Sequence, residues 1–205
     1  MRSAVNKSVK IHSIVADHNV DLRAVTETWI TSDAPPAVNT GITPCGYAVL
    51  HVHRESEKGG PKRGGGLAVI HRDSLVDRNY ALQEQSKSTK FELQLVYVRA
   101  GASSIIIANI YRPTSQFNNA VFFDEIANLL TNIPVTTRKG QLLTGYFNCP
   151  GKDSNTIDTG LTSVLEQSSV KSRPPACSGP CRARPVSHAR RLTHLTVACE
   201  GVPDE

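Results

Sequence analysis

One apolar segment, Ser104 to Tyr111, constrains the fold of this chain more than any other stretch. The turn Gly101-Ala102-Ser103 precedes it, and Arg112-Pro113 follows it at once. A continuous apolar run of this length between turn residues is typical of a central strand that is buried in a sheet. We therefore expect a β-sheet that has this segment at its centre.

Five other segments have the composition of strands, because they are rich in β-forming residues, alternate between apolar and polar residues, or form a short apolar run. They are residues 21–26, 47–53, 66–71, 91–98 and 142–145. The alternation in 91–98 predicts a half-buried strand, whereas 21–26 predicts a buried strand that ends at Glu27. The charged, glycine-rich stretch 55–64 predicts a hairpin loop.

Three segments carry apolar residues at helical spacing. Residues 3–19 predict an opening helix that Asn19 closes in a left-handed cap. A second helix is expected from Asn118 or Asn119 through Leu130, and a third over residues 157–167. Prolines at positions 35, 36 and 44 predict an extended loop. This mixture of strands and helices predicts a layered α/β fold.

The composition fits a folded domain. The chain has 205 residues, of which 39% are hydrophobic and 20% are charged, and this suits one sizeable globular domain. No apolar run reaches the roughly 18 residues of a transmembrane helix, and residues 1–10 lack a secretory signal. We therefore expect a nuclear or cytoplasmic protein with no membrane partner, and we infer no protein partner. The odd number of cysteines, 5, predicts no disulfide framework.

Four short blocks follow one another along the chain. They are Thr26-Glu27-Thr28-Trp29, Arg63-Gly64-Gly65-Gly66-Leu67-Ala68-Val69, Asn109-Ile110-Tyr111-Arg112-Pro113 and Gly145-Tyr146-Phe147-Asn148. In this order the blocks resemble those of the endonuclease domain of non-LTR retrotransposons. That domain belongs to the endonuclease/exonuclease/phosphatase superfamily, with deoxyribonuclease I and the apurinic endonucleases. The resemblance covers about residues 6–167.

The resemblance implies a deoxyribonuclease I-like fold, an α/β layered sandwich of two mixed β-sheets flanked by helices. It also implies that the domain, residues 1–167, is incomplete and truncated at both ends. The family begins with a strand that carries an Asn and needs a Ser-Asp-His block at its far end, and we find neither in this sequence. Residues 168–205 hold 6 Lys or Arg against 3 acidic residues, and we expect them to form a degenerate, disordered basic tail.

Glu27 stands at the end of a predicted strand, where a carboxylate is costly unless it is paired or binds a metal. Carboxylate oxygens, together with water and phosphate oxygens, suit Mg²⁺. Taken alone, Glu27 is more simply explained as a solvated carboxylate or a helix-cap contact. The resemblance implies that it binds the catalytic divalent metal, Mg²⁺ or Mn²⁺.

Two further residues are expected to contact the phosphate of the substrate. The Tyr111 hydroxyl can donate to a phosphate oxygen and stabilise developing charge, although a core aromatic residue with a solvated tip is the alternative. Asn148 matches the family Asn that hydrogen-bonds the scissile phosphate or the attacking water, although an Asn after a strand also forms turns. The resemblance makes both residues catalytic candidates.

Tyr146 occupies the position at which the family carries Asp, in the block Gly-Asp-Phe-Asn. The family Asp orients or deprotonates the attacking water. A phenol, with an ordinary pKa of about 10, is a poor base at neutral pH, and its ring is bulkier than a carboxylate. Loss of a general base costs about 10²–10⁴-fold in rate. We therefore expect catalysis to be impaired.

The formal net charge of +5 suits a polyanionic partner, although an ordinary solvated surface explains it as well. The resemblance implies DNA, and Lys62, Arg63 and Arg112 are the expected DNA contacts. The predicted function is that of a Mg²⁺-dependent phosphodiesterase, which nicks target DNA in its family and is impaired here. Two alternatives stay open: a non-catalytic DNA-binding remnant and, within the same superfamily, a lipid or inositol phosphatase.

Overall fold

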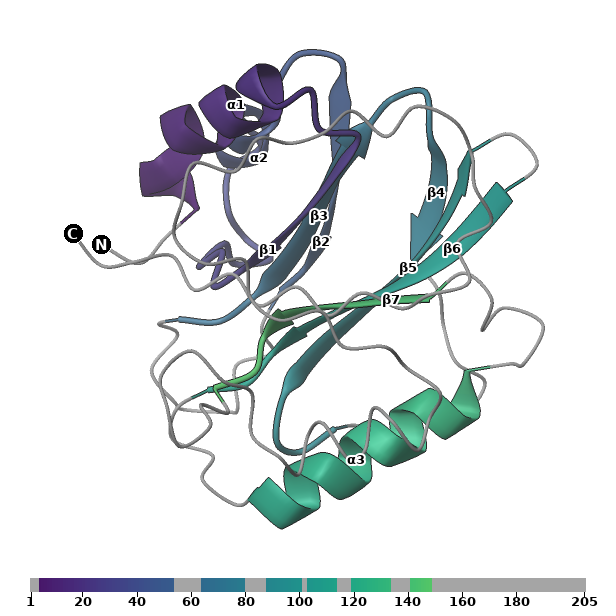
Figure 1. Ribbon diagram of the computed structural model, residues 1–205. Coiled ribbons are helices and arrows are strands. Elements are labelled where there is room, and N and C mark those ends of the chain that lie inside the picture. Colours follow the sequence, from purple (N-terminus) through teal and green to yellow (C-terminus); the bar gives the residue numbers. More distant parts are fainter. Residues whose placement is uncertain are drawn as a thin grey trace.

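The computed structural model describes residues 4–53, 64–79, 88–100, 103–113, 119–133 and 141–148. Over these residues the chain forms two β-sheets that lie against one another, with helices on their outer faces (Figure 1). The predicted third helix, 157–167, and the predicted tail, 168–205, lie outside the described residues, as does most of the predicted loop 55–64. None of the described helices is long and apolar enough to cross a membrane.

Sheet A is antiparallel and has the strand order β1-β3-β2. Its strands are β1 (Leu22–Thr26), β2 (Tyr47–Val52) and β3 (Leu67–Arg72). A 3₁₀ turn (Val5–Lys7) leads into helix α1 (Ser8–Asp17), and α1 and helix α2 (Pro36–Ile42) cover the outer face of the sheet. The buried residues of this layer are Ala4, Ile11, Val15, Ile30, Ile42 and Ile70.

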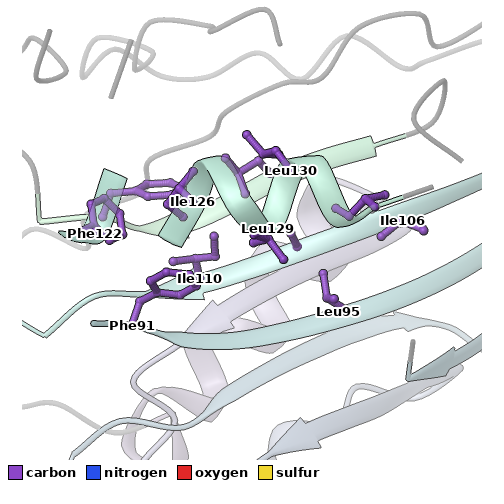
Figure 2. Close-up of a cluster of buried hydrophobic side chains, with 12 residues drawn as sticks. Phe91, Leu95, Ile106, Ile110, Phe122, Ile126, Leu129 and Leu130 are labelled. Atoms are coloured by element: carbon purple, nitrogen blue, oxygen red, sulfur yellow. The ribbon is translucent and has the colours of Figure 1, made fainter. Parts of the chain in front are cut away.

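Sheet B has the strand order β4-β5-β6-β7 and is mixed. Strands β4 (Val76–Asn79), β5 (Glu92–Ala100) and β6 (Ser103–Tyr111) are antiparallel, whereas β7 (Gln141–Tyr146) runs parallel to β6. Helix α3 (Asn119–Asn132) connects β6 to β7 and packs on the outer face of the sheet (Figure 2). The central strand predicted at 104–111 is therefore confirmed.

Two apolar layers enclose sheet B. On one side Phe91, Leu95 and Ile110 pack against Phe122 and Ile126 of α3 (Figure 2). On the other side a cluster of buried residues lies between the two sheets and consists of Val69, Val96, Val98 and Ile107. The order of layers is helix, sheet, sheet, helix, which is the predicted sandwich.

Several sequence predictions need correction. Strand β5 is buried on both faces rather than half-buried, because sheet B lies between sheet A and α3. Strand β1 is half-buried rather than buried, because it pairs with β3 alone among the described strands. The predicted extended loop contains α2, which begins at Pro36, since proline is favoured in the first turn of a helix. Strand β4 was not predicted.

A polar contact joins the two sheets beside the apolar layer between them. Asn109 on β6 is fully buried, and its Nδ2 lies 3.2 Å from each of the carbonyl oxygens of Val25 and Ala68 in sheet A. Gln94, opposite Asn109 on β5, donates from Nε2 to the Leu50 carbonyl at 2.9 Å. Both amides reach from sheet B to the backbone of sheet A, so they fix how the sheets lie on one another.

We expect Asn109→Ala to lower the free energy of unfolding by about 1–3 kcal/mol, because it withdraws a buried donor from two carbonyl oxygens. Urea unfolding measures this loss. Asn128→Ala, on the exposed side of α3, is the matched control and should change stability by less than about 0.5 kcal/mol. Equal effects of the two substitutions would show that Asn109 does not join the sheets.

His51 on β2 and His53, one residue beyond the strand, stack with ring centroids 5.6 Å apart. Burial and, next, the neighbouring His53 imidazole lower the pKa of His51 to about 4. An unfolded His has a pKa of about 6.5, so between these values the unfolded chain binds more protons than the folded one. The contribution of His51 to stability is therefore complete above pH 6.5 and falls as the pH drops towards 4.

Urea unfolding at pH 7 and at pH 5 should show a smaller loss of stability on acidification in His51→Gln than in the unsubstituted chain. His18→Gln, at an exposed position at the end of α1, is the control and should keep the original loss. An unchanged loss in His51→Gln would contradict the assignment.

Candidate active site

A row of polar and aromatic side chains crosses one end of sheet B. The strand register places Glu92 of β5 opposite Tyr111 of β6, and Tyr111 beside Tyr146 of β7. The row faces sheet A, because Tyr111 bonds to Glu27, just after β1, and Glu92 bonds to Gly66, just before β3. The edge at which β6 and β7 end is therefore a polar corner between the two sheets.

Glu27 reaches this corner from sheet A, since it follows the last residue of β1. The Tyr111 hydroxyl donates to Glu27 Oε1 at 2.5 Å. Tyr111 itself is only 8% exposed, so its ring is held in the core while its hydroxyl points to the carboxylate. The two residues are 84 positions apart in the sequence, and the fold brings their side chains into contact.

The backbone at Glu27 adopts an uncommon conformation. Glu27 and Trp29 both have positive φ angles, of 56° and 57°. A left-handed conformation at a residue other than glycine costs about 1–3 kcal/mol and persists only when its surroundings enforce it. Such residues cluster at functional sites, so the conformation is consistent with a site at Glu27.

The glycine run before β3 supplies part of this enforcement. The Thr28 amide donates to the Gly66 carbonyl at 3.1 Å, and the Trp29 amide donates to the Gly65 carbonyl at 2.9 Å. Gly66 has a φ of 84°, and a Cβ there would lie 2.6 Å from Thr28 Oγ1. A side chain at position 66 would therefore meet the Thr28 side chain, and the left-handed φ also favours glycine at this position.

Asn148 lies at the same corner. The backbone of Arg112 donates to the Tyr146 carbonyl at 2.9 Å, and the Asn148 side chain donates from Nδ2 to the Arg112 carbonyl. Asn148 has a φ of 47°, so its backbone turns immediately after β7. These bonds join Asn148 to the residue that follows Tyr111.

Tyr146 ends the row. Its ring stacks on that of Tyr111, with centroids 6.4 Å apart and an angle of 17° between the planes. It is 36% exposed, so one side of the ring borders the core and the rest is open to solvent. An aromatic hydroxyl thus occupies the position at which the sequence resemblance places a carboxylate.

The structure does not support Arg112 as a DNA contact. Its side chain is 1% exposed and donates to Asn119 Oδ1 at 2.7 Å, and its guanidinium lies 4.4 Å from the centre of the Phe122 ring. This buried arginine anchors the start of α3 and cannot reach a DNA backbone. Lys62 and Arg63 lie outside the described residues, which begin again at Gly64.

The donor atoms at the corner fit a hard divalent cation with one protein carboxylate. Glu27 offers that carboxylate from a fixed backbone, and Mg²⁺ is commonly bound by one or two carboxylates plus water and phosphate oxygens. Over the residues that the structure describes, no group of three or more His, Cys, Asp or Glu side chains is placed to hold a metal. Glu27 could therefore supply one carboxylate to a hard divalent cation whose other ligands come from water or phosphate oxygens.

The roles of two residues at the corner were not predicted from the sequence. Glu92 accepts the Gly66 amide on Oε2 at 2.6 Å, and Asn109 joins the sheets one row further inside. The signal was present, because Glu92 and Gln94 are polar residues at alternate positions of one strand. Their inward orientation becomes evident only once both faces of β5 are known to be covered.

No protein-family model matches the sequence, and no curated protein matches it. Solved structures do match. One is the endonuclease domain of TRAS1, a telomere-specific non-LTR retrotransposon, with a TM-score of 0.54, 12% identity, and coverage of 78% of this chain and 64% of that one. Another is the AP endonuclease LMAP from Leishmania major, with a TM-score of 0.55, 12% identity, and coverage of 82% and 64%.

A third is the catalytic domain of human Nocturnin with a bound sulfate anion, with a TM-score of 0.51, 14% identity, and coverage of 75% and 63%. The chain shares its fold with these three solved structures. At these identities the likeness concerns the fold alone. The chain spans less than two thirds of the length of each of these solved chains.

Within sheet B, Gly145 sets the approach of β7 to β6. Its φ is 135°, and a Cβ there would collide with the Ile110 carbonyl group. We expect Gly145→Ala to lower the free energy of unfolding by more than about 3 kcal/mol, since the backbone must change its angles and the strands must separate. Thermal or urea unfolding measures this.

Gly46→Ala is the matched control, because Gly46 also has a positive φ, of 78°, but no atom lies within 4 Å of the position that a Cβ would take. It should cost only about 1–2 kcal/mol, the conformational term alone. Similar losses at the two positions would contradict a steric role for Gly145.

Proposed function

We propose that this chain is an endonuclease-like phosphodiesterase domain of retrotransposon origin, whose metal-dependent hydrolysis of DNA is impaired. The observation that carries the proposal is the hydrogen bond between Glu27 and Tyr111, which come from opposite sheets. This bond supports the site that the four sequence blocks predict. Asn148 and Tyr146 lie at the same corner. The fold shared with the TRAS1 endonuclease domain is consistent with it.

In this proposal Glu27 holds Mg²⁺ or Mn²⁺, which when bound supplies positive charge to the oxygens of the scissile phosphate. The Tyr111 hydroxyl donates its single proton to this carboxylate, so stabilising negative charge on a phosphate would require that proton to turn from Glu27 to a phosphate oxygen. Asn148 contributes a side-chain amide from the end of β7. These three groups bind and orient a phosphodiester of DNA, the proposed substrate.

Tyr146 accounts for the proposed impairment. The stack on Tyr111 keeps its ring at the end of the row, where the resembling family has a carboxylate that activates water. A phenol does not replace that base, and loss of a general base costs about 10²–10⁴-fold in rate. The remaining groups can bind a phosphodiester without hydrolysing it efficiently.

We expect supercoiled plasmid with Mg²⁺ to be nicked at close to the background rate by the unsubstituted chain. Tyr146→Asp should raise the rate by about 10²-fold or more, because it restores a carboxylate. Tyr146→Asn is the matched control, because Asn is almost the same size as Asp but cannot act as a base, and it should stay near background. Adding Glu27→Ala to Tyr146→Asp should remove the gain.

Strong nicking by the unsubstituted chain that requires Mg²⁺ and that Glu27→Ala abolishes would overturn the proposed impairment. Failure of Tyr146→Asp to exceed Tyr146→Asn would show that position 146 is not the place of the missing base.

A non-catalytic DNA-binding domain is the second candidate function. The exposed part of the Tyr146 ring favours it, because an aromatic ring offers a surface on which a base of single-stranded DNA can stack. The net charge of +5 favours the same partner.

Fluorescence anisotropy with a labelled single-stranded oligonucleotide tests this candidate. Affinity should fall as salt rises, and Tyr146→Ala should weaken it by about 5- to 100-fold, the range expected for one stacked base. Tyr146→Phe keeps the ring and serves as the control. Absence of binding at low salt, or an equal loss in both variants, would remove this candidate.

A further inference from the structure

Glu92 at the start of β5 is the carboxylate that the sequence blocks did not include. It is half-buried, faces sheet A and lies opposite Tyr111 in the strand register. We infer that Glu92 is a positioning residue, which fixes the backbone conformation of Glu27 through the glycine run. The part of the inference that concerns metal binding rests on the proposed function, whereas the part that concerns the backbone does not.

The first step is the bond between Glu92 and the glycine run. Glu92 Oε2 accepts the Gly66 amide at 2.6 Å. A hydrogen bond to a carboxylate is stronger than one between neutral groups, and the partly buried setting strengthens it further. Gly66 is therefore tied to the end of sheet B, although it belongs to the segment that leads into sheet A.

The second step joins Gly66 to the residues after Glu27. The carbonyl of Gly66 accepts the Thr28 amide at 3.1 Å, and the carbonyl of Gly65 accepts the Trp29 amide at 2.9 Å. Two hydrogen bonds to the Gly66 backbone thus connect the Glu92 carboxylate to Thr28, the residue that follows Glu27. Glu92 accepts the Gly66 amide, and the Gly66 carbonyl accepts the Thr28 amide. A displacement of Gly66 would therefore move Thr28.

The third step is the strain that this connection maintains. Glu27 and Trp29, on either side of Thr28, have φ angles of 56° and 57°. Both would relax to right-handed or extended conformations if Thr28 were free to move, because the left-handed region is unfavourable for residues with a Cβ. Rotation at Glu27 would turn its carboxylate away from the Tyr111 hydroxyl.

The chemistry of the Glu92 position agrees with this role. A carboxylate that is partly buried between two sheets is costly unless a donor compensates its charge. An apolar residue would pack equally well between the sheets but would leave the Gly66 amide without this acceptor. Glu92 therefore supplies the acceptor that fixes the Gly66 backbone, which an apolar residue at this position would not supply.

Amide hydrogen exchange by NMR on the full chain tests the inference. Glu92→Leu should speed exchange of the Thr28 and Trp29 amides by about tenfold or more, the size expected when a bond to a charged group is lost. Glu92→Gln keeps an oxygen acceptor and should rescue most of the protection. Emission from Trp29, the single tryptophan of the chain, should shift in Glu92→Leu and not in Glu92→Gln.

Glu125 of α3 offers a matched control, because its carboxylate likewise accepts backbone amides, those of Thr89 and Lys90, at 3.0 and 3.2 Å. Glu125→Leu should leave exchange at Thr28 and Trp29 unchanged. If Glu92→Leu does not fold, Glu92→Asp provides the test, since it keeps the charge but withdraws the carboxylate by one methylene and should also speed exchange. Unchanged protection of Thr28 and Trp29 in the folded Glu92 variants would overturn the inference.

A Mn²⁺ titration followed by electron paramagnetic resonance separates this inference from the proposed function. Mn²⁺ affinity should fall by about tenfold or more in Glu92→Leu and recover in Glu92→Gln, as expected for a residue that orients a ligand. Faster exchange with unchanged Mn²⁺ affinity would refute the positioning of a metal ligand. Absence of Mn²⁺ binding by the unsubstituted chain would instead refute the proposed function, and the exchange result would still decide the role of Glu92 in the backbone.

Discussion

The contact between the two sheets is the constraint on which the rest of the structure depends. At its centre the contact is apolar and non-directional, so it brings the sheets together without fixing their relative position. Asn109 and Gln94 add directed bonds from sheet B to the backbone of sheet A. Because these amides lie one row inside the corner, they determine where the end of β1 meets the end of β6, and hence whether Glu27 reaches Tyr111.

The corner combines this fixed arrangement with local strain. Four residues other than glycine have positive φ among the described residues, and three of them, Glu27, Trp29 and Asn148, lie at or beside the corner. Gly145 allows a close approach of the β7 and β6 backbones, and Gly66 leaves room for the Thr28 side chain. Exceptions to ordinary backbone geometry cluster at functional sites, so their gathering here is consistent with the site proposed at this edge. Tyr146, stacked on Tyr111, ends the row of side chains at that edge.

The sequence was sufficient for the elements whose pattern is local. The apolar run 104–111, the helix α3 and the cap at Asn19, with its φ of 49°, all follow from short-range preferences. It was insufficient where tertiary packing decides. Arg112 is a cation and was expected at the DNA, but its side chain is buried against the Phe122 ring. The alternation in β5 resembled a half-exposed strand, because polar residues that bridge two sheets have the same spacing as residues that face water.

The most direct test of the proposed site is a crystal structure of the chain soaked with Mn²⁺, in which anomalous scattering locates the ion. We expect one ion within about 2–2.5 Å of a Glu27 carboxylate oxygen, beside the Tyr111 hydroxyl. An ion bound elsewhere, such as at the His51 and His53 pair, while Glu27 remains bonded to Tyr111 alone, would contradict a metal role for Glu27.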